Sequence, residues 1–159
     1  MKILVFLHGT LIMHNSGLGK CRRKRVEQSH QREKSVLDYE NYVPIGNAVK
    51  KLKVWEKLGA EIVYLSSHEN NKDVKKDRLV LRKYKFPKGK IIFRKKEEEY
   101  FKIVEKIKPD ILIEDDCESI GGKDEMIAPK LKIKIKSIVI KEFEGIDKLP
   151  DNFKDLFRV

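Results

Sequence analysis

Short apolar runs alternate along the chain with longer stretches of helical periodicity, and this alternation constrains the fold more than any other feature. The predicted strands are 2–7, 61–65, 91–93, 110–113 and 137–140. Between them, apolar residues recur three or four positions apart, which predicts amphipathic helices over 46–58, 72–84 and 97–107. Alternating strands and helices are typical of a parallel sheet covered on both faces. We therefore expect an α/β fold with a doubly wound, mainly parallel five-stranded sheet and helices on both faces.

One stretch, 12–43, does not fit the alternation. It contains Gly17, Gly19, clusters of basic residues and only a weak apolar pattern. A long segment after the first strand of such a sheet is usually a functional loop or a small cap. We therefore expect a single domain over 1–159, with 12–43 as an insertion or minimal cap.

A strictly alternating segment, LKIKIK (131–136), precedes the last predicted strand. The alternation places Lys132, Lys134 and Lys136 on one side. Lysines along the edge of a sheet oppose edge-to-edge aggregation. We expect this segment to be a protective edge rather than a binding surface.

The chain is basic: 36 Lys and Arg against 25 Asp and Glu give a formal net charge of +11. The basic residues cluster in 20–34 and 83–96, and the second cluster contains no acidic residue. Such surfaces suit an anionic partner, either nucleic acid or a phosphorylated metabolite. A charged fraction of 38% with only two glutamines is also typical of proteins from hot environments. The charge alone therefore does not identify the class of binding partner.

Two cysteines, Cys21 and Cys117, are too few for a disulfide framework and have no metal-ligand spacing, which predicts two reduced thiols. No apolar run approaches the roughly 20 residues that span a bilayer, so no membrane association is expected. The first residues enter an apolar strand without the basic start and cleavage site of a signal peptide. These features predict a cytoplasmic protein.

Polar groups follow three of the predicted strands, at the point where each strand ends. They are His8-Gly9-Thr10, Ser66-Ser67-His68 and Glu114-Asp115-Asp116. Ligands of open α/β sheets bind beyond the carboxyl ends of the strands, so these groups are expected to share one crevice. Backbone N–H groups and a serine hydroxyl there could bind an anionic oxygen. The carboxylates could hold a hard cation such as Mg²⁺.

These segments resemble the haloacid dehalogenase (HAD) superfamily over the first eleven residues and about 44–143. The first family motif is Asp-x-Asp-Gly-Thr-Leu, and this chain has Phe6-Leu7-His8-Gly9-Thr10-Leu11. The second motif, a Ser or Thr that ends a strand, is similar to Ser66. The fourth, an acidic pair after an apolar strand, is similar to Glu114-Asp115, with Asp116 adjoining. The third motif is a lysine, for which the candidates are Lys95, Lys96 and Lys102.

The resemblance implies a phosphate site that handles a phosphorylated small molecule, because most family members are Mg²⁺-dependent phosphohydrolases that form an aspartyl-phosphate. The implied phosphate-binding residues are Gly9, Thr10, Ser66, Ser67, Lys95 and Lys102. The implied metal ligands are Glu114, Asp115 and Asp116. His8 and Ser66 are the candidate catalytic residues.

The chain departs from the family at the two carboxylates of the first motif. The nucleophile position holds Phe6, and a phenyl ring has no lone pair with which to attack phosphorus or coordinate Mg²⁺. The acid/base position holds His8, and an imidazole is suited to proton transfer near neutral pH. The resemblance, with these two departures, therefore implies a route other than the usual aspartyl-phosphate.

Three functions remain open on the sequence. The first is a hydrolase of phosphate esters in which His8 acts as a general base or as the nucleophile. The second is a catalytically inactive protein that binds a phosphorylated ligand in the same pocket. The third is a nucleic-acid-binding module that uses the basic clusters 20–34 and 83–96. The sequence does not determine the oligomeric state.

Overall fold

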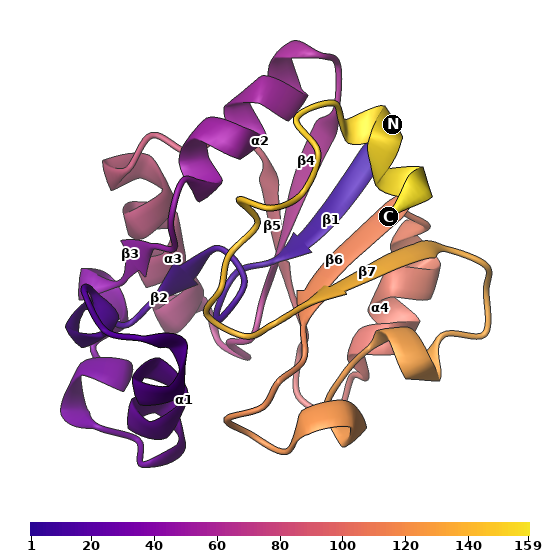
Figure 1. Ribbon diagram of the computed structural model, residues 1–159. Coiled ribbons are helices and arrows are strands. Elements are labelled where there is room, and N and C mark those ends of the chain that lie inside the picture. Colours follow the sequence, from indigo (N-terminus) through magenta and orange to yellow (C-terminus); the bar gives the residue numbers. More distant parts are fainter.

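The computed structural model describes the whole chain, residues 1–159. Its main sheet has five strands: β1 (Lys2–Phe6), β4 (Glu61–Ser66), β5 (Lys90–Phe93), β6 (Ile111–Asp115) and β7 (Lys136–Ile140). Their order across the sheet is β5-β4-β1-β6-β7, and every neighbouring pair is parallel. The first strand of the sequence therefore lies at the centre of the sheet (Figure 1). The predicted five-stranded parallel α/β fold is confirmed.

The three predicted helices lie where the periodicity places them, within a few residues at each end. They are α2 (Ala48–Lys57), α3 (Asn71–Lys83) and α4 (Tyr100–Ile107). The side chain of Asn70 caps α3 by accepting a hydrogen bond from the N–H of Asp73 at 2.9 Å. Helix α4 ends at Ile107, because the next residue, Lys108, has a left-handed backbone (φ 50°) and Pro109 follows it.

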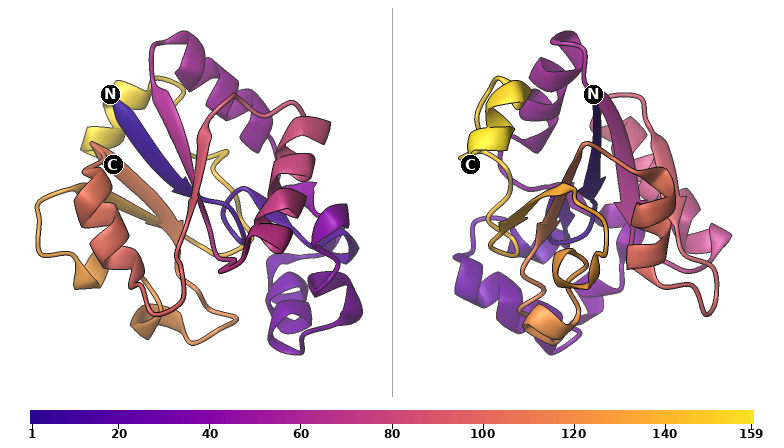
Figure 2. Two further views of the ribbon diagram at one scale, coloured as in Figure 1. Left: turned by 180° about the vertical axis from the view of Figure 1, so that it is seen from behind. Right: turned by 90° about the vertical axis from the view of Figure 1, so that its right-hand side faces the viewer.

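Alternation along β1 divides the core between the two faces of the sheet. Ile3 and Val5 belong to the larger cluster, which includes Trp55 of α2. Leu4 belongs to a second cluster with Val104 of α4. The right-hand view of Figure 2 shows α4 on one side of the sheet and the C-terminal 3₁₀ helix, Phe153–Arg158, on the other. Both termini lie at the end of the sheet opposite the carboxyl ends of the strands (Figures 1 and 2).

Residues 12–43 leave the sheet after β1 and return before α2. Strand β2 (Ile12–Met13) pairs antiparallel with β3 (Val43–Pro44) and closes the base of the segment. Between these strands lie α1 (Arg22–His30) and three short 3₁₀ helices, Asn15–Gly17, Lys34–Val36 and Tyr39–Asn41. Figure 1 shows this segment beside the end of the sheet toward which the arrowhead of β1 points.

The alternating segment 131–136 differs from the prediction. Only Lys136 belongs to a strand, because it begins β7, and β7 itself is the edge strand. The alternation nevertheless appears in the burial: Lys132 and Lys134 are exposed, whereas Leu131 and Ile135 pack on the α4 side of the core. Strict alternation therefore marks a half-buried extended segment that has no strand partner.

Both cysteines are free thiols, as predicted. None of the helices combines the length and the hydropathy that crossing a bilayer requires.

Candidate active site

A cavity of about 420 Å³ opens at the carboxyl ends of the central strands. Each of the three predicted strand ends contributes to its lining, through His8, Ser67 and Asp115. The parallel register explains this convergence, because β1 lies between β4 and β6 and all three strands end at the same edge.

Phe6, the last residue of β1, forms part of an apolar wall of the cavity. Its ring packs edge-on against Tyr100 of α4, with the ring centroids 5.4 Å apart. Phe101 and Ile127 extend the same wall. This side of the cavity offers apolar contact and no nucleophile.

The imidazole of His8 is hydrogen-bonded at both nitrogens. Nε2 lies 2.9 Å from Oδ1 of Asp77, and Nδ1 lies 2.6 Å from Oγ of Ser67. An ionised carboxylate can only accept, so Nε2 carries the hydrogen and donates it to Asp77. Nδ1 then presents its lone pair to the Ser67 hydroxyl, which donates to it. This tautomer makes His8 a base directed at a hydroxyl in the cavity.

Asp77 lies in the middle of α3 and is almost fully buried, with its side chain 1% exposed. Burial alone would raise the pKa of this carboxyl. The attraction of His8 and the hydrogen bonds from His8 and Ser66 outweigh burial and hold the pKa below its ordinary value. Asp77 is therefore an ionised carboxylate that fixes the orientation of His8. Asp77 is not among the residues that the sequence motifs predict.

The two serines after β4 have different surroundings. Ser66 is buried, donates to Oδ2 of Asp77 at 2.6 Å and accepts from the N–H of His68 at 3.1 Å. Its hydroxyl supports the carboxylate and does not line the cavity. Ser67 is exposed and lines the cavity beside His8. The structure thus gives Ser66, the predicted catalytic serine, a supporting position, and leaves its neighbour accessible.

His68 packs against His8, with ring centroids 4.5 Å apart, and against Tyr39 of the 12–43 segment at 4.3 Å. Burial, followed by repulsion from His8, lowers the pKa of His68 to about 4. Its Nε2 has no hydrogen-bond partner and lies 3.6 Å from Oδ1 of Asp77. Donor atoms of the two histidines and Asp77 lie within 4.8 Å of one another. Those of His8 and Asp77 are already bonded to each other, so we assign no metal there.

Gly9 lines the cavity, and the polar groups of Gly9 and Thr10 are hydrogen-bonded within the protein. The N–H of Gly9 donates to the carbonyl of Ile12 at 3.0 Å, within the turn that leads into β2. The hydroxyl of Thr10 donates to Oδ2 of Asp115 at 2.8 Å. Gly9 has a positive φ of 79°, and a Cβ there would approach Oδ2 of Asp115 to 2.8 Å. These two residues therefore pack the turn tightly against Asp115.

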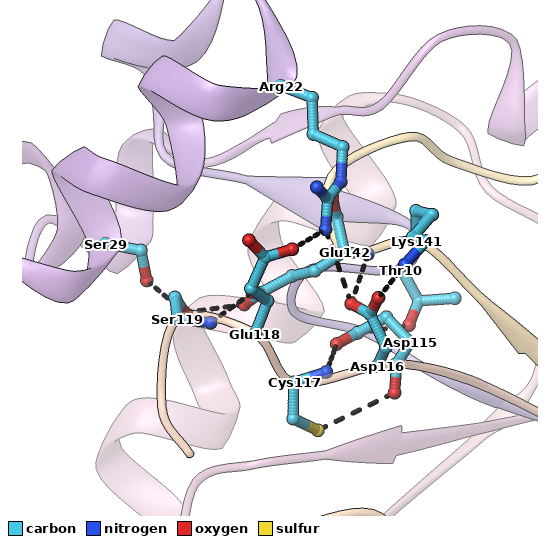
Figure 3. Close-up of polar contacts among 10 residues, drawn as sticks. All are labelled: Thr10, Arg22, Ser29, Asp115, Asp116, Cys117, Glu118, Ser119, Lys141 and Glu142. Atoms are coloured by element: carbon cyan, nitrogen blue, oxygen red, sulfur yellow. Dashed lines mark hydrogen bonds and ion pairs between the residues drawn. The ribbon is translucent and has the colours of Figure 1, made fainter. Parts of the chain in front are cut away.

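A second polar group adjoins the cavity, where β6 and β7 end. Carboxylate oxygens of Asp115, Asp116 and Glu142 lie within 4.8 Å of one another (Figure 3). Asp116 pairs with Lys141 at 3.1 Å and with Arg22 of α1 at 3.5 Å. Neither Asp115 nor Glu142 has an ion pair; their oxygens accept hydrogen bonds from neutral groups, including Thr10, Cys117 and Ser119.

The pKa values of this acidic group reflect its unbalanced charge. Burial raises the pKa of Asp115, and burial together with the nearby negative charge of Asp115 and Asp116 raises the pKa of Glu142 to about 7. Asp116 has a lowered pKa, because the Glu142 N–H, Lys141 and Arg22 outweigh its burial. Oxygen donors of this kind fit a small hard cation, and a cation would balance the two unpaired carboxylates.

Glu114 is separated from this acidic group because side chains alternate along β6. Its two carboxylate oxygens accept from the N–H groups of Ile127 and Ala128, at 2.8 and 2.6 Å. It therefore binds the loop after β6, and Glu142 takes the third position beside Asp115 and Asp116.

The predicted lysines do not reach the cavity. Lys95 and Lys102 are exposed, and neither lines it. Arg94, directly after β5, lines the cavity instead, as does Lys130. The guanidinium of Arg94 pairs with Glu69 and lies 4.7 Å from the centre of the Tyr100 ring. Its Nε is buried and has no partner.

Two arginines of the basic cluster 20–34 form hydrogen bonds or ion pairs with other parts of the protein. Arg22 donates to the carbonyl of Glu142 at 2.9 Å and pairs with Glu118. Arg25 donates to the carbonyls of Gly17 and Phe143. These arginines fasten α1 to the segment after β7.

The sequence matches no family model and no curated protein. Solved structures do match, at low sequence identity. One is a chain of the Pnkp1/Rnl/Hen1 complex, with 14% identity and a TM-score of 0.58 over 89% of this chain and 46% of that chain. The present chain thus spans less than half the length of that neighbour.

Two further neighbours are matched over 99% of this chain. The class C acid phosphatase from Bacillus anthracis has 16% identity and a TM-score of 0.57, over 77% of its own length. A HAD hydrolase of family IA, variant 3, from Entamoeba histolytica has 15% identity and a TM-score of 0.53, over 99% of its length. The fold is therefore that of HAD-like hydrolases and phosphatases, as the sequence motifs predict.

Proposed function

We propose that this protein hydrolyses phosphate esters in the cavity at the strand ends, with His8 as the general base. One observation carries the proposal: Nδ1 of His8 faces a hydroxyl in the cavity, while a buried, ionised Asp77 fixes Nε2. A base that is oriented by a carboxylate and directed into a ligand-sized cavity is typical of hydrolytic sites.

In this proposal Phe6 stands at the nucleophile position of the HAD-like first motif, and His8 stands at the acid/base position. The packing of Phe6 on Tyr100 supports this assignment, because it gives the ring an apolar role in the cavity wall. The aspartyl-phosphate route has no residue to begin from. Hydrolysis then depends on His8 and the groups that it contacts.

The negative charge of a phosphate requires positive partners. Arg94 and Lys130 line the cavity, and the buried Nε of Arg94 is a donor without an acceptor. We assign Mg²⁺ to the group of Asp115, Asp116 and Glu142, where it would neutralise charge on a bound phosphate. Lys95 and Lys102 lie outside this arrangement. Glu114 lines the cavity, but its carboxylate is bonded to the N–H groups of Ile127 and Ala128.

The substrate class is a phosphorylated small molecule with an apolar organic part. The wall of Phe6, Tyr100 and Phe101 suits such a part, and Tyr39 and Tyr42 of the 12–43 segment line the cavity from another side. In this proposal the segment is a minimal cap on a single domain. A cytoplasmic location belongs to the same proposal, because two free thiols suit a reducing compartment.

The test is hydrolysis of p-nitrophenyl phosphate with Mg²⁺ or Mn²⁺ by the wild-type protein and by His8→Gln. Removing a general base lowers a rate by about 10²–10⁴-fold, and that loss in kcat is expected. The matched control is His30→Gln, a change at an exposed histidine of α1 that does not line the cavity. Equal activity of wild type and His8→Gln would contradict the proposal. Phosphate binding without turnover would show the inactive binding protein instead.

A further inference from the structure

Ser67 is the accessible hydroxyl of the cavity that lies closest to a base. It follows β4 directly, is exposed, and places Oγ 2.6 Å from Nδ1 of His8. Its neighbour Ser66 is buried and donates to Asp77. Of the two serines, only Ser67 can present its oxygen to a ligand.

Ser67, His8 and Asp77 form one continuous chain of hydrogen bonds. Ser67 donates to Nδ1 of His8, and Nε2 of His8 donates to Asp77 at 2.9 Å. The carboxylate fixes the tautomer in which Nδ1 is free to take the hydroxyl proton. A hydroxyl, a base and an orienting carboxylate in series are the elements of an activated serine nucleophile.

The same contacts argue against His8 as the nucleophile. Its Nε2 is bonded to Asp77, and its Nδ1 is covered by Ser67. Attack by either nitrogen on phosphorus would require that bond to break first. Attack by Ser67 uses the existing bond, because the proton already points at the base.

We propose that Ser67 is the nucleophile of the reaction and forms a phosphoserine intermediate; this inference rests on the proposed phosphate-ester hydrolysis. In the first half, Oγ of Ser67 bonds to phosphorus as its proton moves to Nδ1 of His8. The bond from phosphorus to the ester oxygen breaks, and that oxygen takes the proton from His8. In the second half, a water oxygen bonds to phosphorus and gives a proton to His8. The bond from phosphorus to Oγ breaks, and Oγ recovers the proton, so ester and water become alcohol and phosphate.

In this reaction Arg94 binds the transferred phosphoryl group. It lines the cavity with Ser67, and its unpartnered Nε can donate to a phosphoryl oxygen. Its contacts with Glu69 and with the Tyr100 ring hold the guanidinium in place. A fixed cation beside a developing negative charge stabilises the transition state of phosphoryl transfer.

The test is covalent labelling of the full chain with a fluorophosphonate, followed by mass spectrometry of the peptides. Oγ of the reactive serine bonds to phosphorus, fluoride leaves and the proton passes to the base. We expect one label, on Ser67. We expect no label in Ser67→Ala and labelling of His8→Gln slowed by about 100-fold or more, in line with the loss of a general base.

The matched control is Ser35→Ala. Ser35 also has a 2.6 Å hydrogen bond, but to the hydroxyl of Ser16 rather than to an imidazole, and it does not line the cavity. Its labelling should equal that of wild type, and thermal melts of all variants establish that they fold.

The outcomes separate this inference from the proposed function. Hydrolysis of p-nitrophenyl phosphate that needs His8 but survives Ser67→Ala, with no label on Ser67, would overturn the serine nucleophile and leave the hydrolase standing. A label on Ser67 without phosphatase activity would support the activated serine and overturn the phosphate substrate. A label on another serine that persists in Ser67→Ala would overturn the inference.

Discussion

Single residues decide which chemistry this cavity can support. Phe6 contributes only apolar surface, so any acid–base or hydrogen-bonding role falls to His8 and the residues that it contacts. A histidine bonded at both nitrogens is held in one orientation, which a flexible exposed histidine is not. His68 beside it adds a second imidazole whose burial opposes its charging.

The buried side chain of His68 should make the free energy of unfolding depend on pH. Its pKa is about 4 in the folded protein, because burial and, next, repulsion from His8 disfavour the charged imidazole. Lys76 lowers the pKa further, whereas the carboxylates of Asp77 and Asp73 raise it and offset part of the shift. The unfolded chain binds the proton at about 6.5, so it binds more protons than the folded chain between pH 6.5 and 4. The free energy of unfolding should therefore fall as pH falls through this window, by about 3 kcal/mol in all.

Urea denaturation of wild type and His68→Gln at several pH values measures this dependence. The variant removes the titrating group, so its stability should fall less between pH 6.5 and 4. Parallel curves for the two proteins would show that His68 titrates normally.

At the scale of elements, α3 supplies the carboxylate and the 12–43 segment covers it. Asp77 lies on the inner face of α3, between Val74 and Val80, which are both fully buried. Tyr39 packs on His68, and Lys76 of α3 lies 5.6 Å from the centre of the Tyr39 ring. The helix and the segment together shield the Asp77 carboxylate from water. Its hydrogen bonds therefore come from protein groups, His8 and Ser66.

Asp77→Asn tests the role of α3. An amide is nearly isosteric, but its Nδ2 would donate to Nε2 of His8 and favour the tautomer that points a hydrogen at Ser67. We expect kcat for p-nitrophenyl phosphate to fall by about 10²–10⁴-fold, and stability to fall by about 1–3 kcal/mol for the lost acceptor.

The control for this change is Asp73→Asn in the first turn of the same helix, where the side chain contacts Asn70 and Lys76 and not the cavity. It should retain kcat. Wild-type kcat in Asp77→Asn would show that the carboxylate has no part in orienting the base.

Periodicity was sufficient to predict the strands and helices, because each buried run packs against the same layer along its whole length. The strand ends predicted the place of the cavity because neighbouring parallel strands end at the same edge of the sheet. Asp77 was missed, although it lies on the apolar face of the predicted helix 72–84, three residues after Val74 and four before Leu81. A charge on that face is the signal that could have found it.

Arg94 and Glu142 were missed for another reason. Both follow predicted strands, 91–93 and 137–140, whose ends are not among the three polar strand ends that define the predicted crevice. Lys95 and Lys102, the lysines predicted in place of Arg94, depended on spacing alone. Spacing cannot tell which side chain turns inward where the backbone is irregular.

For the whole molecule, the net charge of +11 does not describe the cavity. The cavity lining includes the cations Arg94 and Lys130, the carboxylates of Asp115 and Glu142, and apolar residues. Such a lining suits a phosphate, a cation and an organic group. Arginines of the basic cluster 20–34 meanwhile hold α1 against the strand ends.

The central claim is that this one cavity binds the phosphate group. A crystal structure of the protein with tungstate, an oxyanion that mimics phosphate, tests it most directly. The anion is expected between Ser67 and Arg94, within hydrogen-bond distance of both side chains, and Arg94→Ala should lose it. Tungstate bound only on the exposed basic surfaces, with Phe6 packed across a cavity that holds no anion, would contradict the claim.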